Sequence, residues 1–177
     1  MFDEKENARQ GGAIGAQARG DGQWIPAQGI SEAKATAGDY VNFTVPGEPV
    51  GKGRPRAAKR GKHITLYTPE KTASYENLVA LAAQKAMLCK PLFKGALRMR
   101  LHIFTAPPQS WSQKKRAQAL RGEILPTTKP DLDNVLKAVA DACNNVVFVD
   151  DKQIVEVYVA KRYSELPRAV VIVEALN

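Results

Sequence analysis

Residues 129–143, KPDLDNVLKAVADAC, contain the clearest structural period in this chain of 177 residues. Apolar side chains recur three or four positions apart, at Leu132, Val135, Leu136, Val139, Ala140 and Cys143. A 3.6-residue period of this kind is typical of a helix that buries one face in a core. Pro130 disfavours helical backbone at Lys129, so we predict that the helix begins at residues 131–133.

The polar face of this predicted helix carries the candidate chemistry. Asp131 and Asp133 lie at its start, and Lys137 follows one turn beyond Asp133. A second acidic pair, Asp150 and Asp151, comes soon after the helix. If the two pairs meet, like charges about 4 Å apart cost about 4 kcal/mol at an effective dielectric of about 20. Mg²⁺ or Mn²⁺, which favour oxygen ligands, would remove that cost, so the spacing suggests a metal site.

The same residues have a plainer interpretation, which the spacing leaves open. Asp is common at helix starts because it caps the helix and complements its dipole. Asp133 and Lys137 form an ordinary i,i+4 pair, and Asp150 with Asp151 fits a simple turn.

Further elements are expected on both sides of this segment. Alternating and β-branched residues predict strands at 40–46, 63–67, 97–105 and 146–149. One further helix should begin with Pro69 in its first position and run to about Met87. Another, which is basic, should follow a cap at Ser110 or Ser112 and end near Gly122.

The length and composition fit one domain with an extension. Hydrophobic residues make up 44% of the chain and charged residues 25%, which is the usual globular range. Residues 1–38 are rich in Gly, Ala and Gln and lack a sustained period, so we predict a flexible, disordered arm. Residues 39–177 are the predicted folded domain.

Basic charge is concentrated after the predicted arm. The chain has a net charge of +8, and residues 41–177 contain 22 Lys and Arg against 12 Asp and Glu. This excess suits a polyanionic partner, although charge alone fits an ordinary basic protein equally well. The candidate DNA contacts lie on a glycine-punctuated loop, on the basic helix and before Pro130: Lys52, Arg54, Arg56, Lys114, Lys115, Arg116 and Lys129.

Several protein classes are disfavoured by what the sequence lacks. Its two cysteines form no CxxC pair and no His-Cys cluster, which argues against a zinc site. No apolar run has the length of a membrane span, and the N-terminus does not have the layout of a secretory signal. We therefore expect a cytoplasmic protein.

Two motifs in the second half carry a family resemblance. The segments KPDLDNVLKA at 129–138 and VVFVDDKQIV at 146–155 resemble the RusA family of Holliday junction resolvases, which is common in phages and prophages. In the first half, FTVPGEPVGKGRPR at 43–56 and YTPEKTASY at 67–75 resemble the opening of its phage-type members. The resemblance covers about residues 40–177 in order, and the combined PDxDNxxK and DDxQI signature is specific.

This resemblance implies an α+β (mixed α/β) fold, in which a small mixed β-sheet packs with helices in a single domain. It also implies a homodimer that nicks opposing strands of a four-way DNA junction symmetrically, in recombination and repair. Asp131, Asp133 and Asp151 would bind catalytic Mg²⁺, with Asp150 close by, and Lys137 matches the family's catalytic lysine. No small-molecule cofactor is expected.

Two other functions are alternatives. A non-catalytic nucleic-acid-binding protein would need only the basic loop and helix, and its junction binding would be indifferent to Mg²⁺. A nuclease with the same metal chemistry would instead act on forks, flaps or duplex ends.

Overall fold

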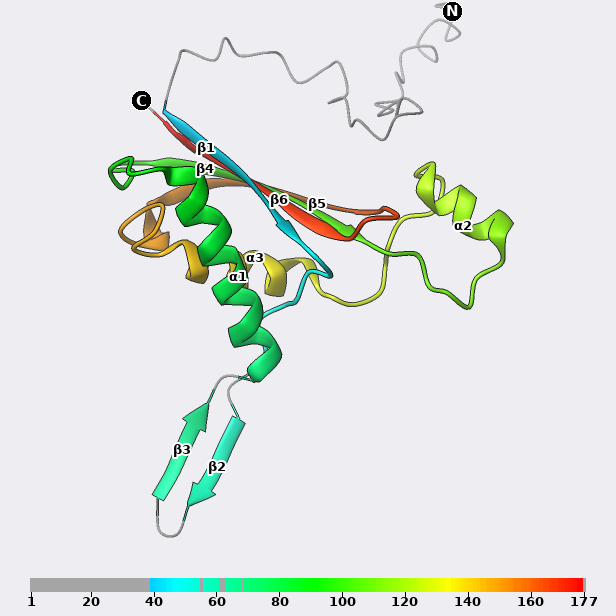
Figure 1. Cartoon of the computed structure of the whole chain (residues 1–177), viewed down its shortest axis with the longest axis horizontal. Coiled ribbons are helices and arrows are strands. Elements are labelled where there is room, and N and C mark those ends of the chain that lie inside the picture. The colour runs from blue at the N-terminus through cyan, green and yellow to red at the C-terminus, as the bar shows by residue number, and fades with distance from the viewer. Residues whose placement is uncertain (1–38, 55, 61–62, 68, 177) are drawn as a thin grey trace, which may run out of the picture. The chain divides into compact units, whose positions relative to one another are not determined.

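The computed structural model describes residues 39–54, 56–60, 63–67 and 69–176 (Figure 1). The chain divides into two units, Met1–Ala37 and Gly38–Asn177, and every described residue belongs to the second. The predicted arm at 1–38 therefore lies outside the described residues. The described part forms a four-stranded mixed sheet, a two-stranded sheet and three α-helices, which confirms the α+β class.

The larger sheet has the strand order β1-β6-β4-β5. Its strands are β1 (Tyr40–Pro46), β6 (Arg168–Ala175), β4 (Leu97–Thr105) and β5 (Ile154–Tyr163). β5 pairs parallel with β4, and the other two pairings are antiparallel. Buried residues alternate with exposed ones along β1 and with half-buried ones along β4, so one face of the sheet points into the core. The predictions for 40–46 and 97–105 are confirmed at both ends.

The smaller sheet is a hairpin of β2 (Arg56–Arg60) and β3 (His63–Tyr67). Its second strand confirms the prediction at 63–67, whereas its first strand falls in the segment that the sequence indicated only as a basic loop.

Helices α1 (Glu70–Met87) and α3 (Leu132–Cys143) lie on one side of the larger sheet, as Figure 1 shows. Their inward residues and those of β1, β4 and β6 form a single apolar core, which includes Val79, Val135, Val139, Leu101 and Val171. Helix α2 (Gln113–Leu120) follows β4. No helix in the described ranges is long and apolar enough to cross a membrane.

The predicted helix positions are confirmed with small corrections. Pro69 occupies the N-cap position of α1 and not its first helical position. Ser112 caps α2 by accepting a hydrogen bond from the backbone of Lys115 at 3.4 Å. Leu132, which the period placed in the core, is 37% exposed because it begins α3 at the edge of the packed layer.

The predicted strand at 146–149 is wrong. This segment forms turns with isolated bridges at Phe148, which pairs with Phe93 and with Asn144. Val147 and Phe148 are fully buried, so the apolar run reports a core contact and not a strand. A short 3-10 helix, η1 (Asp151–Gln153), follows and leads directly into β5.

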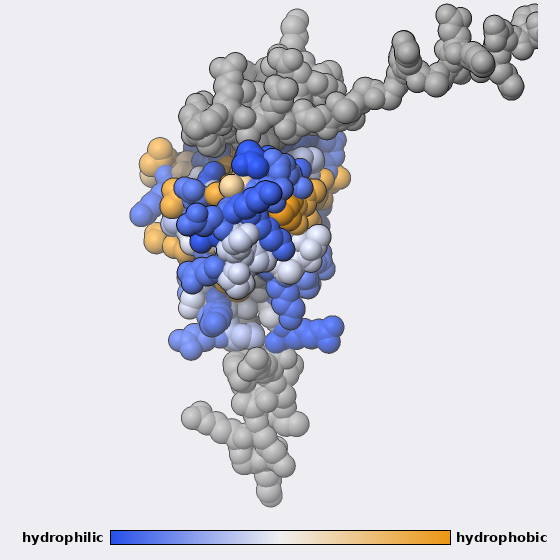
Figure 2. Space-filling model, turned by 90° about the vertical axis from the view of Figure 1, so that its right-hand side faces the viewer, coloured by the Kyte–Doolittle hydropathy of each residue, from blue (hydrophilic) through white to orange (hydrophobic). Residues whose placement is uncertain are grey.

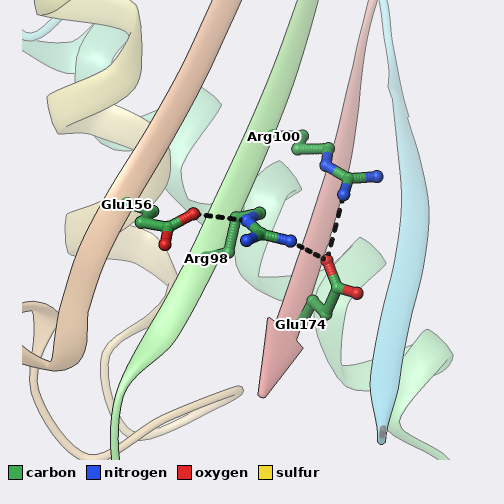
Figure 3. A network of polar contacts seen from close by, with 4 residues as sticks. All are labelled: Arg98, Arg100, Glu156 and Glu174. Carbon is green, nitrogen blue, oxygen red and sulfur yellow. Dashed lines mark hydrogen bonds and ion pairs between the residues drawn. The ribbon is translucent and has the colours of Figure 1, made fainter. Parts of the chain in front are cut away.

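The face of the sheet that points away from α1 and α3 is crossed by a charged network (Figure 3). Arg98 on β4 contacts Glu156 on β5 at 2.6 Å and Glu174 on β6 at 3.3 Å. Arg100 contacts the same oxygen of Glu174 at 3.2 Å. These ion pairs join three adjacent strands across the surface of the sheet.

Candidate active site

Three of the predicted site residues occupy the start of α3. Asp131 is the N-cap residue, with an extended backbone, but its side chain makes no capping hydrogen bond. Its carboxylate accepts a hydrogen bond from the side chain of Asn134 at 3.4 Å. Asp133 lies in the first turn, Lys137 lies one turn later, and both are exposed. The helix therefore presents two carboxylates and one ammonium group to solvent.

Contacts from two other segments secure this helix start. The backbone N–H of Lys52 donates to the carbonyl of Asn134 at 2.8 Å. Gly51 permits this approach, because a Cβ atom there would lie 2.9 Å from the Cβ of Asn134. On the other side, the ammonium group of Lys161 donates to two carbonyls within the loop 128–130, which leads into α3.

The second acidic pair is organised by η1. The carboxylate of Asp150 caps this short helix by accepting from the N–H of Lys152 at 3.0 Å, and the Lys152 ammonium group lies 3.1 Å away. Gln153 completes a capping box by bonding back to the N–H of Asp150. The backbone and side-chain hydrogen bonds from Lys152 lower the pKa of Asp150. Asp151 is exposed.

The two acidic pairs do not meet within one chain. Asp131 begins α3, whereas η1 follows the turn at the far end of the helix, where Asn144 pairs with Phe148. A helix of 12 residues is about 18 Å long. β5 then runs back until Lys161 reaches the loop before Asp131.

In the described ranges, no group of three or more His, Cys, Asp or Glu side chains is arranged to hold a metal ion. The expectation that both pairs share one small volume of a single chain is therefore wrong. The intervening apolar run is a turn and not a strand, so it does not return the chain to the start of α3. The chain does fit Mg²⁺ at Asp131 and Asp133, since this ion is often held by one or two carboxylates together with water and substrate phosphate.

The predicted basic loop has an internal role at its first basic residue. The ammonium group of Lys52 lies 2.6 Å from Glu76 on α1 and 2.7 Å from Asp141 on α3. Burial lowers the pKa of Lys52, but its hydrogen bonds to these two carboxylates outweigh burial and raise that pKa overall. Arg54 is exposed, and the side chain of Arg56 lies outside the described residues.

The predicted basic helix is exposed at all three of its candidate contacts. Lys114, Lys115 and Arg116 are exposed on α2, as is Lys129 before α3. Figure 2 looks onto the side on which α2 lies in Figure 1, and strongly hydrophilic residues cover much of the described surface there. A surface of this kind is accessible to a nucleic-acid backbone.

Trp111 anchors α2 to the sheet. Its ring meets Tyr163 at the end of β5 edge to face, with centroids 5.5 Å apart. The Lys115 ammonium group lies 4.0 Å from the Trp111 ring centroid. Through these contacts Trp111 packs the start of α2 against the end of β5.

Two sets of contacts at the site, those of Lys161 and of Lys52, were not predicted from the sequence. Lys161 continues the alternating row Val155, Val157, Val159 of β5, so a lysine in a row of valines was the available signal. The partners of Lys52, Glu76 and Asp141, lie 24 and 89 positions away. Asp141 continues the polar row of Asp133 and Lys137 at i,i+4 spacing, but the sequence does not indicate that Lys52 is its partner.

The chain is similar to known proteins over most of its length. The model of the family "Endodeoxyribonuclease RusA" matches residues 46–174, which contain both acidic pairs, the basic loop and α2. A protein of Bacillus subtilis (strain 168), described as uncharacterized protein YqaN, is 38% identical over 141 residues, which is 78% of this chain and 99% of the relative. The chain belongs to the RusA family of endodeoxyribonucleases.

Proposed function

We propose that this chain is a metal-dependent endonuclease that resolves four-way DNA junctions by paired symmetric nicks. The observation that carries the proposal is the start of α3, where Asp131, Asp133 and Lys137 are presented together in a member of an endodeoxyribonuclease family.

The carboxylates of Asp131 and Asp133 are the proposed ligands of Mg²⁺ or Mn²⁺. A bound divalent ion would supply a water of lowered pKa and neutralise charge that builds on the phosphate. Lys137 is the proposed partner of the scissile phosphate, because its ammonium group lies on the same helix one turn beyond Asp133. No salt bridge to a described residue competes for Asp131, Asp133 or Lys137.

We propose that in a homodimer the second acidic pair of one copy lies beside the start of α3 of the other copy. Asp150 already accepts hydrogen bonds within η1, so Asp151 is the freer carboxylate and the proposed third ligand. Because it follows the C-terminal end of α3, whereas Asp131 lies at the N-terminal end, we propose that Asp151 joins Asp131 and Asp133 from a second copy. Val149 and Val155, which flank η1, are 53% and 61% exposed, and such apolar residues suit a protein contact at this position.

The basic residues of α2 are proposed to hold the junction arms. Lys114, Lys115, Arg116 and Lys129 would contact phosphates, which fixes the position of the DNA without reading its sequence. Arg54 and Arg56 stay predicted contacts of the same kind. Each phosphate contact should contribute about 0.9 to the slope of log affinity against log salt concentration.

The first test incubates a synthetic four-way junction with Mg²⁺ and compares wild type, Asp133→Asn and Asp39→Asn. Asp39 is an exposed carboxylate at the start of the described domain, so it is a matched control. We expect Asp133→Asn to bind the junction and fail to cut it, while Asp39→Asn cuts like wild type. Equal cutting by all three proteins would refute the proposal. Fork and linear duplex competitors distinguish a resolvase from a nuclease of forks or duplex ends.

A second test mixes Asp133→Asn with Asp151→Asn, each of which we expect to be inactive alone. If each site takes Asp133 and Asp151 from different copies, mixed dimers contain one intact site and recover single nicks. If both residues serve the same copy, both sites of the mixed dimer are damaged and no nicking returns. Light scattering on the same samples measures the oligomeric state.

A further inference from the structure

Lys161 is a basic residue placed where the fold otherwise puts apolar side chains. It is the register partner of Ile103, which is completely buried on the core face of β4. Lys161 is partly buried, and its ammonium group contacts the loop before α3. An ammonium group in such a position needs compensating acceptors.

Two backbone carbonyls provide this compensation. The Lys161 Nζ atom lies 2.6 Å from the carbonyl oxygen of Thr128 and 3.0 Å from that of Pro130. Within the described part of the chain, no carboxylate forms an ion pair with it. The Lys161 ammonium group therefore holds the loop 128–130 in place. This loop ends at Pro130, directly before Asp131.

The loop needs fixing because α3 does not cap itself. Asp131 is the N-cap residue, but its carboxylate makes no capping bond to the helix backbone and accepts instead from the side chain of Asn134 at 3.4 Å. Without a capping bond, the direction in which the chain enters the helix depends on contacts from outside the helix. Lys161 supplies them from β5, and the N–H of Lys52 supplies another from the opposite segment.

We propose that Lys161 is a positioning residue for Asp131 and Asp133, which it orients through the loop 128–130. The proposal rests on the function proposed above, because it assigns these carboxylates to a divalent ion. It predicts that loss of the Lys161 ammonium group weakens ion binding while the core and the metal-free DNA contacts are retained. Groups that orient metal ligands typically change metal affinity by about 10- to 100-fold.

The test compares wild type, Lys161→Met, Lys161→Arg and Lys85→Met. Methionine keeps much of the length of the side chain and removes the donors, arginine restores donors and charge, and Lys85 is an exposed lysine in the last turn of α1. Mn²⁺ binding is measured by electron paramagnetic resonance without DNA, and hydrogen exchange is followed over residues 128–134. Junction binding is measured in EDTA, and cutting is measured against Mg²⁺ concentration.

We expect Lys161→Met to bind Mn²⁺ about 10-fold more weakly and to exchange hydrogen faster at 128–134. Junction binding in EDTA should match wild type, Lys161→Arg should recover part of the Mn²⁺ affinity, and Lys85→Met should be unchanged. Mn²⁺ affinity and exchange equal to wild type in Lys161→Met would overturn the inference. If Lys161→Met fails to fold, Lys161→Val takes its place, because it also lacks donors and continues the valine row of β5. Mn²⁺ affinity and exchange equal to wild type in Lys161→Val would then overturn the inference.

The two proposals fail in different ways. If wild type binds no Mn²⁺ and cuts no junction, the metal-dependent function fails. If wild type cuts, Asp133→Asn does not, and Lys161→Met behaves as wild type in both binding and exchange, only the positioning role is lost.

Discussion

Replacing Lys52 with methionine should destabilise the domain more than it weakens DNA binding. The Lys52 ammonium group bridges Glu76 and Asp141 at 2.6 and 2.7 Å, and these side chains are only 21–27% exposed. Exposed ion pairs contribute about 0.2–1 kcal/mol and breaking a buried pair costs about 3–5 kcal/mol, so this half-buried bridge should contribute roughly 2 kcal/mol. For a domain of this size the melting temperature should fall by roughly 6 °C.

The stabilisation that the Lys52 ion pairs contribute depends on pH. The pKa of Lys52 in the folded protein is raised above its ordinary value of 10.5, so the folded state binds the proton more tightly than the unfolded state. The stabilisation is fully present below pH 10.5 and is lost as pH rises through the folded-state pKa. The melting temperatures of wild type and Lys52→Met should therefore differ at pH 7 and converge at strongly alkaline pH.

Circular dichroism melts measure the stability, and junction binding at several salt concentrations measures the DNA contact. Lys85→Met, at an exposed position of α1, is the control and should change neither quantity. An unchanged melting temperature together with weaker binding and a smaller salt slope would contradict the bridging role. That result would make Lys52 the phosphate ligand that the sequence suggested.

Three further predictions concern packing and reactivity. Gly51→Ala should cost roughly 1–3 kcal/mol in urea unfolding, because the new Cβ would lie 2.9 Å from the Cβ of Asn134; unchanged stability would contradict this contact. Tyr75→Phe should be neutral or stabilising by up to about 1 kcal/mol, since the hydroxyl is buried without a hydrogen-bond partner among the described residues, and a larger loss would reveal a partner. Burial raises the pKa of the Cys143 thiol to about 12, so a thiol reagent at pH 8 should label exposed Cys89 rapidly and Cys143 only after unfolding; two equally fast thiols would refute this.

Local periodicity predicted some of the elements that bury a regular face, but β5 and β6 were not predicted, although β6 alternates buried and half-buried residues. The strands at 40–46 and 97–105 and the helix after Pro130 follow directly from their apolar periods, and the strand at 63–67 was also predicted. The run 146–149 failed because a short apolar segment fits a buried turn as well as a strand, and only contacts with Phe93 and Asn144 decide between them. The local sequence of residues 146–149 does not reveal these contacts.

For the candidate site, the identities of the acidic residues were predictable and their arrangement was not. Asp131 and Asp133 are two positions apart at a predicted helix start, so the sequence placed both correctly at the start of α3. The relation of Asp151 to that start depends on the path of the chain through a turn, η1 and β5. The roles of Lys52 and Lys161 depend on partners from other elements, which a single sequence does not reveal.

The uninterrupted helix between the two acidic motifs has a consequence for how relatives of this chain can diverge in length. Removing or adding one residue within α3 would move Asp131 about 1.5 Å along the axis and turn it by about 100° relative to η1. The interval between the motifs should therefore be constant in number of residues across functional relatives. Insertions should accumulate in irregular connections, such as that between β4 and α2, where no rigid rod fixes the spacing.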